Sequence, residues 1–222
     1  MEIRTVYRRK LKGIQEEMLV MSDIVGKAIL RSVEALKTRN LEMANQIIAG
    51  DHDVNHKRFE IEEKCIELIA TQQPIAGDLR VIIAGIIMTQ ELERIGDYAA
   101  GIAKIVIMIG DEPPLKPLID IPLMAEKVVD MLNRSMDAAF HRDVEACKKV
   151  VAEDDLVDNL YDQVFRELLV FMMEDPRTVT RATRLIWVAH NLERAADRVT
   201  NICERAVFVV TGKMEEIGGS KY

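Results

Sequence analysis

Two acidic motifs in this chain have the residue types and the spacing of a cation site. The first, ELERIGD, contains Glu93 and Asp97, and the second, NLERAAD, contains Glu193 and Asp197. Residues four positions apart lie on one face of an α-helix, one turn from each other, so each motif stacks two carboxylates. Like charges at this spacing destabilise an isolated helix by about 0.2–0.5 kcal/mol. A bound cation would remove the repulsion, and the unfavourable pair occurs twice, 100 residues apart.

A second pair of oxygen-bearing residues precedes each motif. Asp51 and Asn55 are four positions apart, and Asp154 and Asp158 repeat that spacing in the second half of the chain. Two weaker candidates continue the same faces by one turn: Asp162 and Asn201. If the helices that carry these ladders are antiparallel neighbours, each half brings two ladders together. Such oxygen clusters suit Mg, Mn, Fe or Zn, and several facing carboxylates can bridge more than one ion.

Two simpler explanations of the ladders need no metal. Glu-x-x-x-Asp pairs are common on solvated helix faces, where water screens the charges. Arg94 and Arg194 sit beside the ladders and could neutralise the carboxylates directly. The duplication strengthens the case for a cation site, and both metal-free explanations stay open.

Two histidines lie close to the first Asp51 ladder. His52 and His56 are four positions apart, a spacing that can bind zinc on a helix. Their counterparts in the second half are Asp155 and Asn159, so the duplicated arrangement does not require histidine. Both are therefore secondary candidates for metal ligands.

The motifs belong to a duplicated unit. The segment RSVEALKTRNLEMA, which starts at Arg31, matches RSMDAAFHRDVEAC, which starts at Arg134. The same offset of 103 pairs Ala49 and Asp51 with Ala152 and Asp154. From Ile86 onward the offset is 100, which indicates a length change in a loop near the prolines at 74 and 176.

The spacing of the prolines predicts long helices. The long stretches between the six prolines contain no proline, which favours helices. None of these stretches shows the period-two alternation of a strand, so strands are not expected. The expected helices span residues 3–38, 41–72, 78–109, 123–141, 143–174 and 177–211, with Asn40 and Asp143 as N-caps. This predicts an all-α fold of two tandem three-helix bundles: residues 1–110, a Pro-rich connector at 111–122, and residues 123–222. Gly96 and Gly101 inside one helix indicate either a close helix approach or access to a bound ion.

Composition excludes several classes of protein. The net charge is −7 and no basic stretch is interleaved with aromatics, so a nucleic-acid binder is not expected. The N-terminus lacks the apolar core of a signal peptide, no apolar run reaches the ~18 residues of a membrane span, and the three cysteines form no disulfide framework. A cytoplasmic protein is therefore expected.

No catalytic motif accompanies the ladders. There is no Gly-rich phosphate loop, nucleophile elbow or zincin motif in the sequence. Three functions stay open: a regulatory binding protein, a metalloenzyme acting on phosphate esters at a carboxylate-bridged metal pair, and a helical adaptor without metal. The regulatory, non-enzymatic protein is the leading hypothesis.

The chain resembles the PhoU family, the accessory and regulatory proteins of bacterial phosphate transport. The resemblance rests on ELERIGDYA and NLERAADRV, on GDLR at Gly77–Arg80 and on VVTG at Val209–Gly212, and it covers essentially the whole chain. It implies paired three-helix bundles and an E(D)xxxD motif that binds multinuclear metal clusters. The positions that match this motif are Glu93, Asp97, Glu193, Asp197, Asp154 and Asp158. Asp51 with Asn55 departs from it, because the second residue is an amide.

The resemblance also implies partners. One implied partner is the ATPase subunit of the phosphate ABC transporter, and another is the phosphate-sensing histidine kinase, whose signalling proteins of this family help to keep off. The resemblance also implies a homodimer. These partners are expectations from the family and do not follow from the composition or the periodicity.

Overall fold

The computed structural model describes residues 2–217, and the side chains from Thr5 to Ile217. This part of the chain is helical and contains no strand. Its elements are α1 (Glu2–Thr38), α2 (Leu41–Gln72), α3 (Gly77–Ile109), α4 (Asp120–His141), α5 (Val144–Ala152), α6 (Asp154–Glu174), the 3-10 helix η1 (Pro176–Thr178) and α7 (Val179–Thr211). The all-α prediction is confirmed. None of these helices is long and apolar enough to cross a lipid bilayer.

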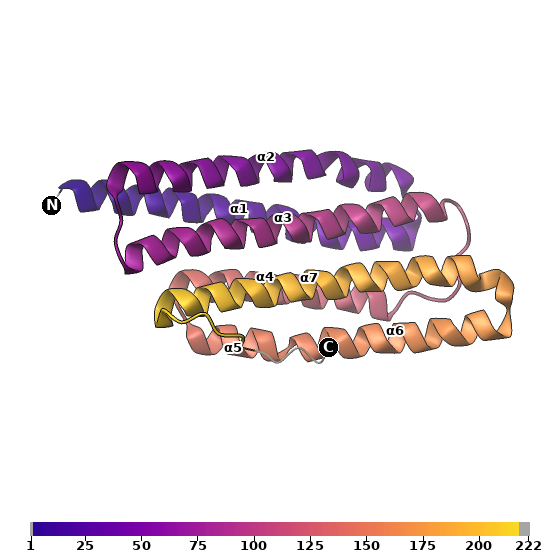
Figure 1. The fold of residues 1–222 in the computed structure, drawn as a ribbon. Helices are drawn as coiled ribbons and strands as arrows, with labels where there is room; N and C mark the ends of the chain where they lie inside the picture. Colours follow the sequence, from indigo (N-terminus) through magenta and orange to yellow (C-terminus); the bar gives the residue numbers. More distant parts are fainter. Residues whose placement is uncertain (1, 218–222) are drawn as a thin grey trace.

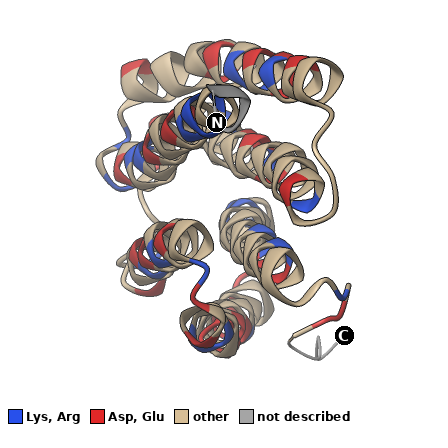
Figure 2. Cartoon of the chain, turned by 90° about the vertical axis from the view of Figure 1, so that its left-hand side faces the viewer, with Lys and Arg blue, Asp and Glu red and all other residues tan. Residues whose placement is uncertain are grey.

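The helices form two three-helix bundles that lie side by side (Figure 1). In each bundle successive segments of the chain run in alternating directions, and α5 with α6 takes in the second bundle the place that α2 takes in the first. The bundles meet where α3 packs on α7 and α1 packs on α4. Charged residues of both signs are spread along the helices of both bundles (Figure 2). The predicted tandem architecture is therefore correct.

Both predicted N-caps are present. The Asn40 side chain accepts a hydrogen bond from the Met43 amide, and the Asp143 side chain accepts one from the Ala146 amide, each at 2.9 Å. These bonds satisfy backbone donors that the first helical turn leaves unpaired. The caps start the second helix at matching places in the two repeats.

Three predicted boundaries were wrong in detail. The helix expected over residues 143–174 is interrupted at Glu153, which separates α5 from α6. The connector ends at Ile119 and not at Pro122, because α4 begins at Asp120 and a proline is tolerated in the first turn, where amides have no intrahelical partner. The last helix begins at Val179, after the short η1.

The two bundles share one contiguous hydrophobic core. Ser32 and Ser135, which the repeat pairs, are both fully buried, and each donates to a carbonyl three residues earlier, at 2.7 and 2.8 Å. Both glycines lie at close helix contacts, which is one of the two explanations that the sequence offers. A Cβ at Gly96 would lie 3.2 Å from Val54 of α2, and one at Gly101 would lie 2.8 Å from the side chain of Asn191 on α7.

Candidate metal centre

Within each bundle, the acidic ladders of neighbouring helices lie close enough for their charges to interact. In the first bundle, Glu93 and Asp97 on α3 face Asp51 on α2. Burial and then the nearby charge of Asp97 raise the pKa of both Asp51 and Glu93. Three carboxyl groups from two helices therefore share one electrostatic site.

Asp51 is the most constrained member of this first site. Its Oδ1 is buried without a hydrogen-bond partner, while Asn55 donates to its Oδ2 at 3.3 Å. Asn55 also donates to the Asp51 carbonyl at 3.1 Å, which orients the amide along the helix. A buried oxygen without a partner is unfavourable, and a cation would satisfy it.

The second bundle concentrates more acid. Burial raises the pKa of Asp154 to about 7, with further contributions from Asp158, Asp197 and Glu193. Burial and the charge of Asp197 likewise raise the pKa of Glu193 to about 7. Asp154 Oδ1 and Glu193 Oε2 are both buried without a hydrogen bond. The second site therefore has two buried carboxylate oxygens without a hydrogen bond, where the first has one.

His190 lies beside the second ladder without neutralising it. Its Nδ1 is 3.4 Å from Glu193 Oε2 but does not form a hydrogen bond with it. Burial lowers the pKa of His190, which keeps the imidazole neutral at pH 7. The charge of Glu193 is thus not balanced by this histidine.

Arginines compensate the two sites differently. In the first site, Arg58 of α2 lies between Glu62, at 3.2 Å, and Glu93, at 3.7 Å. In the second, Arg194 pairs with Asp197 at 2.9 Å, as the metal-free explanation predicted. Arg94, the counterpart of Arg194, is exposed and lowers the pKa of Glu93 only from a distance. Part of the acidic charge is therefore paired without a metal.

The donor set fits a hard cation, although its side chains are not gathered around one point. Within residues 5–217, no three His, Cys, Asp or Glu side chains already have the arrangement of a metal site. Three buried carboxylate oxygens without hydrogen bonds, on Asp51, Asp154 and Glu193, have the chemistry that Mg, Mn or Fe takes. Side-chain rotation at the ladders would be needed to enclose an ion.

The secondary candidates have partners outside the ladders. His52 lies 4.0 Å from Asp53, and His56 lies 3.4 Å from Glu60, both on the exposed face of α2. Asp162 lies 4.0 Å from Arg166. Asn201 does not extend the Glu193 ladder, because its amide donates to Glu91 of α3 at 3.3 Å.

Glu91 is a polar contact between the bundles that was not predicted. Besides Asn201, it contacts Arg198 of α7 at 3.5 Å. At the offset of 100, Glu91 and Arg198 correspond to Asn191 and Tyr98, so the duplication gave no signal for this pair. Arg58 escaped notice for the same reason, since its counterpart is Tyr161.

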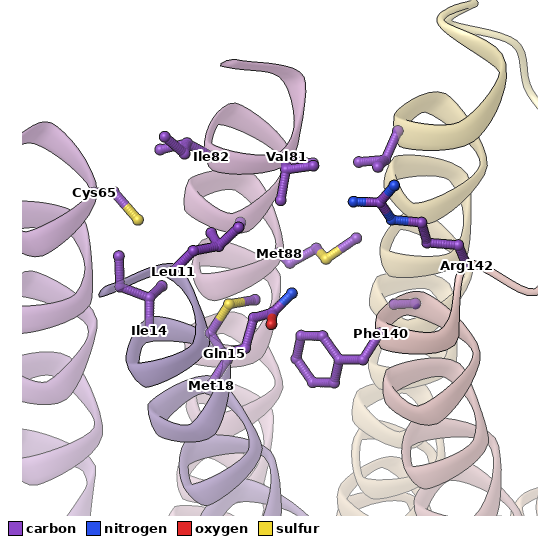
Figure 3. Close-up of a pocket in the computed structure, with 14 residues that line it drawn as sticks. Leu11, Ile14, Gln15, Met18, Cys65, Val81, Ile82, Met88, Phe140 and Arg142 are labelled. Carbon is purple, nitrogen blue, oxygen red and sulfur yellow. The ribbon is translucent and has the colours of Figure 1, made fainter. Parts of the chain in front are cut away.

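A separate apolar pocket lies between the bundles (Figure 3). Met18 and Met88 of the first bundle and Phe140 of the second line it, and the Arg142 side chain reaches its edge. Its volume is only about 40 Å³, and no carboxylate lines it. This pocket is therefore distinct from the acidic sites.

Comparison with known proteins places the chain in a family. A family model described as "PhoU domain" matches residues 18–106 and again 121–206. The phosphate-specific transport system accessory protein PhoU homolog of Aquifex aeolicus is 40% identical over 206 residues, with 93% of each chain covered. The homolog of Clostridium acetobutylicum is 37% identical, with 96% of this chain and 98% of that protein covered.

Solved structures agree with the sequence matches. The crystal structure of PhoU from Pseudomonas aeruginosa has a TM-score of 0.88 at 31% identity and covers 93% of this chain and all of its own. That of the phosphate transport system regulatory protein PhoU from Streptococcus pneumoniae has a TM-score of 0.87 at 28% identity, covering 94% and 99%. The two matched domains coincide with the two bundles that carry the acidic ladders. The chain therefore belongs to the PhoU family.

Proposed function

We propose that this protein is a cytoplasmic, metal-binding regulator of phosphate uptake and of phosphate-starvation signalling. Family membership supports the coarser role, the regulation of phosphate transport, because relatives across the full length carry the names of accessory or regulatory proteins of that system. The finer role includes two partners, the ATPase subunit of the phosphate ABC transporter and the phosphate-sensing histidine kinase. A homodimer is part of the same proposal.

The single observation that carries the metal-binding part is the buried acid in each bundle. Burial and the charges of neighbouring carboxylates raise the pKa of Asp51 and Glu93 in the first bundle, and of Asp154 and Glu193 in the second. Asp97 in the first bundle, and Asp158 and Asp197 in the second, supply part of that repulsion. These residues, with Asn55, would hold Fe, Zn, Mn or Mg, singly or as a cluster. When bound, the metal would supply a positive coordination site for a partner carboxylate or for phosphate. The rigid helices on either side fix the spacing of the two sites.

Binding to the transporter ATPase tests this role. We expect the protein to bind the purified ATPase subunit more tightly with Mn²⁺ than with EDTA, as measured by biolayer interferometry. Changing Asp97 and Asp197 to Ala should reduce the metal-dependent part by at least about tenfold. Equal binding with Mn²⁺ and with EDTA would reject a metal-dependent contact. Absence of binding under both conditions would reject the ATPase as partner.

A metalloenzyme is the second candidate, favoured by the Glu193 and Asp154 carboxyls with pKa near 7. Such groups are suited to proton transfer at neutral pH. A turnover assay with generic phosphate monoesters and added Mn²⁺ or Fe²⁺ distinguishes the two functions. The regulatory proposal predicts no turnover that depends on Glu193.

A further inference from the structure

The two repeats differ at one ionic cluster beside the acidic ladders. In the second repeat, the Glu153 carboxylate accepts from Arg134 Nη1 at 2.9 Å and from Arg134 Nη2 at 2.7 Å, and Lys127 also contacts it. This two-point contact is the strong geometry of an arginine–carboxylate pair. Together with Lys127 it lowers the pKa of Glu153 to about 2. The cluster ties the junction of α5 and α6 to α4.

The first repeat keeps the arginine of this cluster and lacks the carboxylate. At the offset of 103, Arg31 corresponds to Arg134, and Gly50 corresponds to Glu153. Arg31 donates instead to the neutral Gln46 side chain at 2.8 Å. A Cβ added at Gly50 would meet no atom within 4 Å, so the position faces open space.

That open space is a pocket of about 220 Å³ between α1 and α2. Lys27, Arg31 and Gln46 are polar groups that line it. Its apolar lining residues are Ile24, Ala28, Ile47 and Val54. Lys27 also pairs with Asp23 along α1, at 2.6 Å. The pocket is therefore small and partly apolar. Its arginine, Arg31, has no carboxylate in the place that Glu153 takes beside the counterpart Arg134.

Formal charge across the matched positions supports the same conclusion. Lys27, Arg31 and Asp51 leave the lining of the first pocket with one net positive charge. The positions of the second repeat that match the pocket lining carry three bases, Lys127, Arg134 and Lys149. They also carry three acids, Asp130, Glu153 and Asp154, so the formal charges cancel. Asp51 at the pocket edge is no obstacle, because its counterpart Asp154 lies next in sequence to Glu153.

We infer that the pocket between α1 and α2 binds a short aliphatic carboxylate, which takes against Arg31 the place that the Glu153 side chain takes against Arg134. The apolar lining suits methylene groups and the arginine suits a planar carboxylate, as in the second repeat. This favours an alkyl carboxylate over tetrahedral phosphate. The pocket borders the first acidic site at Asp51, and the proposed contact with Arg31 needs no metal.

Glutarate is a suitable probe, titrated at constant ionic strength in EDTA and followed by the backbone amide NMR signal of Gly50. We expect saturable shifts at Gly50 and Arg31. Inorganic phosphate should bind at least about threefold more weakly. A capped Gly-Glu-Gly peptide distinguishes the source: binding of the peptide indicates an acidic side chain of a partner, and binding of glutarate alone indicates a free small acid.

Two substitutions at Gly50 form a matched pair. Gly50→Glu should supply the missing carboxylate internally and reduce glutarate affinity by at least about tenfold, as should Arg31→Gln. Gly50→Ala also replaces a glycine that disfavours the helix, but it adds no carboxylate. It should therefore bind glutarate as the unchanged protein does. Circular dichroism verifies that each variant is folded.

The reciprocal variant should create a second site. Glu153→Gly opens the matching space beside Arg134, so glutarate should then also shift the amide at position 153. The inference is overturned if the folded, unchanged protein shows no saturable glutarate shifts. It is also overturned if Gly50→Glu binds glutarate as tightly as Gly50→Ala, or if phosphate binds as tightly as glutarate.

Discussion

The carboxyl groups of Asp154 and Glu193 make the stability of this protein depend on pH. In the folded state their pKa values are about 7, whereas unfolded Asp and Glu titrate near ~4. Between these values the folded protein holds more protons than the unfolded one. The free energy of unfolding therefore falls as pH rises from about 4 to about 7. The stabilising contribution of the two groups is fully present below about pH 4 and is lost above about pH 7.

Asp154→Asn removes one of these groups. Between pH 4 and pH 8, the free energy of unfolding should fall less for this variant than for the unchanged protein. The difference between the two falls should be about 1–2 kcal/mol, after allowing for solvent screening of a partly exposed group. Urea unfolding in EDTA at several pH values measures this difference. Asp53→Asn, on the exposed face of α2, is the control. Parallel pH dependences of Asp154→Asn and the unchanged protein would contradict the assignment.

The two candidate sites should differ in metal affinity. The first has an amide, Asn55, where the second has Asp158, and it has Arg58 near Glu93. Affinity in oxygen sites rises with the number of ligand charges. Asn55→Asp should therefore raise Mn²⁺ affinity of the first site by about tenfold, measured by electron paramagnetic resonance titration. Asn159→Asp, which adds the same charge on an exposed part of α6, should leave affinity unchanged; an equal gain there would indicate a nonspecific charge effect.

At the residue scale, the duplication singles out the acidic ladders as candidate ligands, and their metal binding stays a prediction. That the ladders of neighbouring helices interact electrostatically required only that those helices run antiparallel. The contacts of Arg58 with Glu93 and of Glu91 with Arg198 could not be found in this way, because each joins two helices and the counterparts of Arg58 and Glu91 are Tyr161 and Asn191. Contacts formed by only one repeat leave no trace in an internal comparison.

At the scale of elements, the N-caps are the local features with the clearest energetic role. Asn40→Ala and Asp143→Ala should each lower the free energy of unfolding by about 1 kcal/mol, because each removes the side-chain acceptor of an unpaired helical amide. Urea unfolding followed by circular dichroism measures the loss. Asn45→Ala, at an exposed position inside α2, is the control and should not be destabilising. A cap variant as stable as this control would show that water replaces the cap.

The helix bounds were largely predictable from caps and prolines, but the break between α5 and α6 was not. Local sequence favours continuity there, as α2 shows by running through Gly50. The break coincides with Glu153, which Arg134 and Lys127 hold against α4. Such a tertiary ion pair has no signature in local helix propensity.

At the scale of the whole molecule, we expect the shared core to make the two bundles one cooperative unit. The side-by-side packing of α3 on α7 could not be read from the sequence, because tandem repeats are equally compatible with separate bundles joined by a linker. Gly101 against Asn191 is one contact that fixes this packing.

Ile61→Ala tests the cooperativity. Ile61 is fully buried in α2, which packs only within the first bundle, and its truncation should cost about 2–5 kcal/mol. Trp187, the only tryptophan, lies on α7 in the second bundle. Its fluorescence and the helical circular dichroism should shift together to lower urea concentration. Ile66→Ala, at an exposed position on α2, is the control. A Trp187 transition that stays unchanged would indicate independent bundles.

Metal content tests most directly whether the paired acids are cation sites. The protein, purified without chelator and dialysed against Mn²⁺, should retain metal by inductively coupled plasma mass spectrometry. The variant with Asp97 and Asp197 changed to Ala should lose it while keeping its helical circular dichroism. A variant with Asp53 and Glu145 changed to Ala removes one exposed acid from each repeat and should retain the metal. Equal metal in the Asp97/Asp197 variant and the unchanged protein, or none in either, would contradict the account.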